Sequence, residues 1–343
     1  MGAVLTVLFG LSGAIVYGFA DFLGGLASRR VRPVVVTAVA AAIGIVPLLV
    51  GLVVLGGVFS WPAAVWGAVA GLSGGVGVLL LYAALAIGPM SVLSPVTAVF
   101  AAVVPVLVAV FRGTVLSPVA TSALVVAVVA VVLVAVVRDA SGARLTARGV
   151  AAAAVAGCGF GGIVLAYDMT PSDSGIAPLV VARVLQAVLL GAAALVVVLR
   201  TGGPVSAPTS ARPDGASAVR GPRSGRAWGP RLLVTVAVCG VFDAMANVFI
   251  QAGLHSSDDP ATLPVVSVLN ALYPIGTVVL AGVVLRERLT AQQWIGIVLA
   301  FVASVALALA SRCGAASPHR AANAATDERT RTVRRAGAVR RRG

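Results

Sequence analysis

Long apolar segments separated by short polar connections recur along most of the chain. Each segment contains about 20 mainly hydrophobic residues, which is the length that an α-helix needs to cross the hydrocarbon core of a bilayer. The pattern therefore predicts an all-α polytopic membrane protein with about ten transmembrane helices. The expected spans are roughly 4–26, 34–56, 63–86, 91–111, 118–137, 149–168, 176–199, 232–254, 261–285 and 291–310.

The segment Pro264–Leu289 reads as a membrane helix with a proline in its middle, followed by a short charged turn. Pro274 has no N–H to donate, so a kink is expected there, and the freed carbonyl needs a neighbour, a water or a ligand. An earlier segment, 95–106, aligns with 264–275 and places Pro105 on Pro274. The chain is therefore interpreted as a duplicated bundle with helix kinks at both prolines.

Two segments lack the apolar pattern. Residues 200–231 are rich in Pro, Gly, Ser and Arg and are expected to form a flexible loop. Residues 311–343 are polar and rich in arginine and are expected to be a disordered tail. The expected domains are then a first five-helix repeat over 3–137 and a second over 149–310, which contains the loop.

Composition and charge agree with a multi-pass protein of the cell membrane whose surroundings are the lipid bilayer. The chain is 59% hydrophobic and only 10% charged, and its net charge is +14. All basic residues are arginines, mostly beside apolar spans, so lipid headgroups and topology explain them better than nucleic acid does. The cysteines are scattered without metal or disulfide spacing, so no metal or cofactor is expected.

The arginines in the loops and those in the C-terminal tail favour opposite orientations of the chain in the membrane. The loops after odd-numbered spans hold nearly all loop arginines, whereas the loops after even-numbered spans hold only Arg112. Positive loops favour the cytoplasm, which places both termini outside. The arginine-rich tail would then have to be translocated, so the orientation stays open at this point.

Sequence motifs in the second half resemble the EamA-like branch of the drug/metabolite transporter superfamily. The segment Leu285–Ser304 reads LRERLTAQQWIGIVLAFVAS, and Pro274, Glu287 and Gly296 stand where that family has a kink proline, a turn acid and a glycine. The first repeat lacks the acidic turn, since 111–118 reads FRGTVLSP. Two further segments resemble a bacterial subgroup of the family: Tyr17–Arg30 and Leu79–Val96.

The resemblance implies two five-helix repeats, the second inverted relative to the first. It also implies a secondary transporter that moves a small metabolite or drug by alternating access, and an exporter is expected. Inverted repeats with broken helices near the midplane are typical of such carriers. The expected ligand is a small-molecule substrate, and coupling of its transport to a proton is left open. The protein is expected to be a monomer or a homodimer.

Asp243 is the leading candidate for a substrate or proton site. It lies near the middle of span 232–254, where an ionisable residue is costly and marks a functional site by default. Asn247 and Gln251 follow at steps of four, so the three side chains form one stripe that we expect to face the bundle interior. The alternative is an interhelical seam of hydrogen bonds.

Other polar residues extend this candidate site. Arg183 lies inside span 176–199, where it could bind an anionic substrate or pair with a carboxylate such as Asp243 or Asp168. Asn270 and Tyr273 are neighbours on one helix face and are expected to line a pocket, with core packing as the alternative.

Four further residues are weaker candidates or have an expected structural role. Tyr17 and Tyr82 could contact a substrate, although a lone aromatic in a span more often packs. Asp21 is expected to form an interfacial ion pair with the arginines of segment 29–32. Glu287 is expected to anchor its turn.

Two other classes of function remain as alternatives. A membrane-embedded enzyme acting on a lipid-like substrate would show clustered His, Asp or Glu, but the chain has only His255 and His319 and no phosphate-binding or HExxH motif. A structural or sensory protein would not need a charge at the depth of Asp243. The duplicated, proline-broken pattern favours a transporter and not an enzyme.

Overall fold

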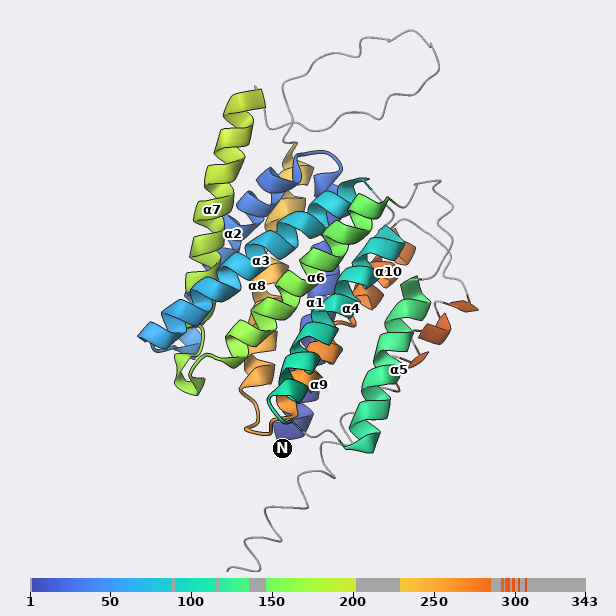
Figure 1. The fold of residues 1–343 in the computed structure, drawn as a ribbon. Coiled ribbons are helices and arrows are strands. Elements are labelled where there is room, and N and C mark those ends of the chain that lie inside the picture. Colours follow the sequence, from blue (N-terminus) through green and yellow to red (C-terminus); the bar gives the residue numbers. More distant parts are fainter. Residues whose placement is uncertain are drawn as a thin grey trace, which may run out of the picture.

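The structure is a computed structural model that describes residues 2–87, 90–114, 117–135, 146–201 and 229–284, and isolated positions between 291 and 306. In this part of the chain every regular element is a helix, and the helices form one bundle (Figure 1). The prediction of an all-α polytopic fold is confirmed. The helices are α1 (Gly2–Ser28), α2 (Pro33–Leu55), α3 (Trp61–Ile87), α4 (Met90–Phe111), α5 (Pro118–Ala135), α6 (Ala147–Asp168), η1 (Ser172–Ser174), α7 (Ala177–Thr201), α8 (Pro230–Leu254), α9 (Thr262–Asn270) and α10 (Tyr273–Val284).

Six of these helices, α1, α2, α3, α6, α7 and α8, are long and apolar enough to cross a membrane. Their ends carry ordinary start and stop signals. Proline occupies the first turn of α2 and α8, where its missing N–H costs nothing. Thr146 caps α6 by accepting a hydrogen bond from the backbone N–H of Gly149, and Gly56 ends α2 with a φ of 79°.

The ninth span differs from the kinked helix that the sequence predicts. α9 ends at Asn270, residues 271–272 form a turn, and α10 begins at Tyr273. The chain is therefore broken before Pro274, which lies in the first turn of α10, where a proline fits without loss of a hydrogen bond. α4, by contrast, continues through Pro105 as a single helix, and a kink at that residue stays a prediction.

The helices pack in a reciprocal pattern between the two halves of the chain. α1 packs along α8 and along α9 and α10, and in the same way α6 packs along α3 and along α4. The first helix of each expected repeat thus contacts the third and fourth helices of the other repeat. This is the exchange of contacts that two inverted five-helix repeats produce.

The expected boundaries of the repeats, 3–137 and 149–310, agree with this grouping and stay a prediction. Most of loop 200–231, the whole of tail 311–343 and Glu287 lie outside the described residues.

Small residues allow the helices to approach closely, while large apolar side chains face outward. A Cβ at Gly71 in α3 would lie 2.8 Å from the carbonyl oxygen of Ala182 in α7, so these two backbones are nearly in contact. Large side chains such as Val53, Leu199 and Val234 are exposed on the outer surface. An apolar exterior around a tightly packed interior is what a bilayer requires.

Candidate functional site

A buried ion pair joins the first part of α7 to the middle of α8. The guanidinium of Arg183 pairs with the carboxylate of Asp243, and both side chains are less than a tenth exposed. Arg183 also donates from Nη1 to Oε1 of Gln186, one turn further along α7, at 3.0 Å. Of the two carboxylates expected as partners of Arg183, Asp243 is the one that the structure places there. Pairing offsets the large cost of holding either charge alone at this depth.

The polar stripe on α8 faces the interior of the bundle, because Asp243, Asn247 and Gln251 are all buried. Asn247 donates from Nδ2 to the backbone carbonyl of Asp243 at 2.8 Å. Gln251 donates from Nε2 to the hydroxyl of Thr170 at 2.9 Å, while its Oε1 has no partner. The stripe therefore both ties α8 to the segment after α6 and leaves an acceptor open.

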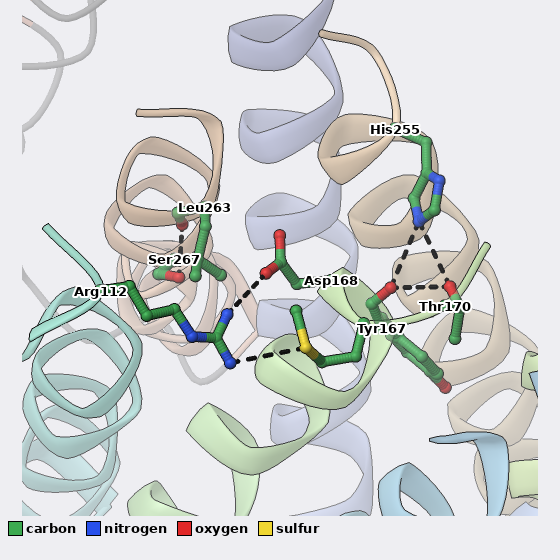
Figure 2. Close-up of polar contacts among 8 residues, drawn as sticks. Arg112, Tyr167, Asp168, Thr170, His255, Leu263 and Ser267 are labelled. Carbon is green, nitrogen blue, oxygen red and sulfur yellow. Dashed lines mark hydrogen bonds and ion pairs between the residues drawn. The ribbon is translucent and has the colours of Figure 1, made fainter. Parts of the chain in front are cut away.

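The stripe continues for one more turn to His255, which the sequence analysis did not single out as a site residue. Nε2 of His255 lies 3.2 Å from the carbonyl oxygen of Tyr167 and 3.3 Å from Oγ1 of Thr170 (Figure 2). Thr170 donates its own hydrogen to Tyr167 at 2.7 Å. In the tautomer that carries a hydrogen on Nε2, His255 donates to this carbonyl oxygen and joins the end of α8 to the end of α6.

A second contact joins the end of α4 to the end of α6. Arg112 pairs with Asp168 at 3.4 Å and lies 3.5 Å from the sulfur of Met169 (Figure 2). The two charged side chains are 45% and 24% exposed, so solvent weakens their attraction. The end of α6 is thus held by α4 on one side and by α8 on the other.

These groups line an open cleft of about 410 Å³ at the end of the bundle where the even-numbered loops lie. Its carboxylates outnumber its single arginine, so the mouth of the cleft is acidic. The charged and polar residues of the lining include Arg112, Asp168, Thr170, His255, Asp258 and Asp259.

A separate small cavity lies deeper in the bundle. Its volume is about 10 Å³, roughly the room that one water needs. The rings of Tyr17, Phe160 and Tyr273 surround it with pairwise centroid distances of 6.3 Å to 6.5 Å. Five helices contribute to its lining, which consists of Tyr17, Asp21, Phe160, Ile163, Val164, Ile250, Asn270 and Tyr273.

Asp21 is one of these lining residues, and the expectation of an interfacial ion pair is wrong. Its side chain is only 3% exposed. α1 continues to Ser28, so Asp21 lies about 10 Å below the end of the helix, out of line with the arginines that follow. No hydrogen bond or ion pair joins its carboxylate to another residue in the part of the chain that the structure describes.

The structure separates the three candidate tyrosines. Tyr17 and Tyr273 line the cavity, and Tyr273 donates its hydroxyl to the carbonyl oxygen of Ser94 at 3.1 Å. Tyr82 lies outside the cavity, with its hydroxyl 3.2 Å from the sulfur of Cys239 and its ring against Gly24. Tyr82 therefore fills the contact between α1, α3 and α8.

Asn270 lies at the break between α9 and α10 and lines the cavity, so the expected pocket wall of Asn270 and Tyr273 is present. Its Oδ1 is buried without a hydrogen-bond partner. A buried acceptor left open in this way is unusual and is a candidate ligand contact.

Some site residues could not be singled out from the sequence. Phe160 lies in an apolar, glycine-rich span and carries no polar signal. His255 does continue the four-residue steps of the α8 stripe, which is the signal that would have found it. Among the described residues, no group of three or more His, Cys, Asp or Glu side chains could hold a metal ion.

Comparisons with known proteins agree with the resemblance seen in the sequence. Residues 148–309 match the model of the EamA-like transporter family. A protein of known crystal structure is 18% identical, with a TM-score of 0.63 over 90% of this chain and 97% of its own, and therefore shares the fold. No curated protein matches the chain significantly. Residues 148–309 are thus similar to an EamA-like transporter domain, in agreement with the resemblance of the sequence motifs to the drug/metabolite transporter superfamily.

Proposed function

We propose that the protein is a secondary transporter that exports a small organic metabolite or drug across the cell membrane by alternating access. The single observation that carries the proposal is the buried pair of Arg183 and Asp243 in the interior of an EamA-like membrane protein. A charged pair at this depth is expensive to retain for packing alone, because apolar residues of similar volume stabilise a bundle at least as well. A role in transport explains why it is kept.

The two ends of the bundle differ, as alternating access requires. At the end of the even-numbered loops the 410 Å³ cleft is open. Toward the opposite end the helices are close, with Thr277 donating to the carbonyl oxygen of Gly18 at 3.1 Å and Cys239 donating to that of Ala20 at 3.3 Å. If the arginine-rich loops are cytoplasmic, the cleft lies on the outer face of the membrane, where an exported solute would be released.

The broken helix supports the same proposal. Residues 271–272, between α9 and α10, form a turn beside the inner cavity, and the open Oδ1 of Asn270 lies at this point. Irregular backbone at membrane depth is tolerated only where it is buried in protein or lines a cavity, and in carriers such breaks bind substrates and ions.

Asp243 is the carboxyl that we expect to carry a coupled proton. Its carboxylate is paired with Arg183, and a rearrangement that separates the two side chains would leave a buried acidic group without its partner. Asp243→Asn keeps the shape and an acceptor for Arg183 but removes the titrating group.

The experiment is transport of a panel of metabolites and drugs into liposomes that contain the purified protein. For a solute that the wild type transports, Asp243→Asn is expected to reduce uptake driven by a pH gradient to the level of protein-free liposomes, while exchange at equal pH continues. Asp173→Asn changes an exposed carboxylate in the loop between α6 and α7 and is the matched control. This variant should transport the solute as the wild type does. Unchanged proton-driven uptake by Asp243→Asn would overturn the coupling role, and a panel without any transported solute would overturn the function.

A further inference from the structure

The inner cavity contains a carboxylate without a positive partner. Asp21 is buried, lines the cavity and has no hydrogen bond or ion pair to another described residue. The charged group that acts on it among the described residues is Asp243, which is itself an acid and is already paired with Arg183. An ionised carboxylate in an apolar cavity is costly unless a positive charge joins it. The cavity therefore favours a ligand that brings that charge.

The walls of the cavity suit a cation as well. The rings of Tyr17, Phe160 and Tyr273 meet there at tilted or perpendicular angles of 40° to 86°. Aromatic faces attract a cation within about 6 Å of the ring centroid, and the attraction grows where water is excluded. Tyr273 is held in place by its hydrogen bond to the carbonyl oxygen of Ser94, so this ring is fixed before any ligand enters.

The hydrogen-bond acceptors and the small volume of the cavity favour a primary ammonium group over a quaternary one. Asp21 and the unpartnered Oδ1 of Asn270 both accept hydrogen bonds. A primary ammonium group offers three N–H donors to such acceptors, whereas a quaternary ammonium offers none. The cavity has room for about one water, which matches an –NH₃⁺ head group and excludes a group with four alkyl substituents.

We propose that Asp21, Asn270 and the three rings form the binding site for a primary ammonium group of the transported solute. Asp21 supplies the opposite charge, Asn270 a second acceptor, and the rings a water-free wall. The assignment rests on the proposed transport function and adds the substrate class and a residue whose sequence position suggested a different role.

The test is the melting temperature of the detergent-purified protein with four small probes at matched ionic strength. Butylammonium is expected to raise the melting temperature of the wild type, because a ligand that binds only the folded state stabilises it. Butanol and butyrate, which have similar size but no positive charge, and tetramethylammonium, which has no N–H, are expected to have no such effect. Equal stabilisation by butyrate or tetramethylammonium would overturn the proposal.

Substitutions then locate the site. Asp21→Asn is expected to abolish the butylammonium shift, and Asn270→Ala and Phe160→Leu to reduce it. Asp173→Asn is the matched carboxylate control and should keep the full shift. Asp21→Asn without ligand should melt no lower than the wild type, because Asp21 has no hydrogen bond or ion pair to a described residue that the substitution could break, so loss of the shift reports binding and not misfolding. A full shift in Asp21→Asn would place the ammonium site elsewhere and overturn the assignment.

The two proposals fail in different ways. Transport of solutes that lack an amine, together with no response to butylammonium, would overturn the ammonium site and leave the transporter in place. Asp21-dependent binding of butylammonium without transport of any solute would overturn the transport function alone.

Discussion

At the scale of single residues, the interior of the bundle contains one acidic residue that is paired with an arginine, Asp243, and one that has no such partner among the described residues, Asp21. Arg183 and Asp243 neutralise each other, whereas Asp21 has no such partner among the described residues. The first two could be singled out from the sequence because an ionisable residue in mid-span is rare. The predicted ion pair of Asp21 with Arg29 or Arg30 was wrong because closeness along the chain does not bring helical side chains together. Two further turns of α1 separate Asp21 from these arginines.

The charge pair makes a prediction about stability. Arg183→Leu leaves Asp243 as an unpaired buried charge and is expected to lower the free energy of unfolding by about 3–5 kcal/mol. Adding Asp243→Asn removes that charge, so the double variant should recover most of the loss. Unfolding in mixed detergent micelles, followed by circular dichroism for the wild type, both single variants and the double variant, measures the coupling. Strictly additive effects would mean that the pair does not interact as the structure indicates.

At the scale of helices, the length of the apolar segments was sufficient to place the first nine spans, whose observed helices begin and end within a few residues of the expected limits. Most of the tenth expected span, 291–310, lies outside the described residues. The break between α9 and α10 was not predictable in the same way. Pro274 indicates that the helix is disturbed, but the disturbance lies upstream at residues 271–272. A proline fits the first turn of a new helix as well as the bend of an old one, and tertiary packing decides between them.

The break makes a prediction of its own. Pro274→Ala restores an N–H and is expected to let α9 and α10 join into one helix, which would raise or preserve thermal stability but reduce transport several-fold. Pro105→Ala is the comparison variant, because α4 already continues through that residue. Melting temperature and solute exchange on the same preparations measure the two effects. Undiminished exchange in Pro274→Ala would show that the break has no part in transport.

At the scale of the whole molecule, the inner cavity lies where helices from both halves of the chain meet. Its lining comes from α1, α6, α8, α9 and α10, so no stretch of sequence contains it. The reciprocal packing of α1 on α8 and of α6 on α3 places this cavity between the two expected repeats. The existence of two repeats was predictable from the aligned prolines, but which side chains meet between them depends on packing across the bundle.

The proposed transport by alternating access requires that this cavity be reached in turn from both sides of the membrane. The most direct measurement is labelling of Ile250→Cys, a cavity residue on α8, by a membrane-impermeant methanethiosulfonate, with Cys158, Cys239 and Cys313 replaced by alanine. Ser172→Cys in the cleft is the one-sided control. We predict that position 250 is labelled both in intact cells and in inverted vesicles, whereas position 172 is labelled in only one of these two preparations. Labelling of position 250 from one side alone would contradict alternating access.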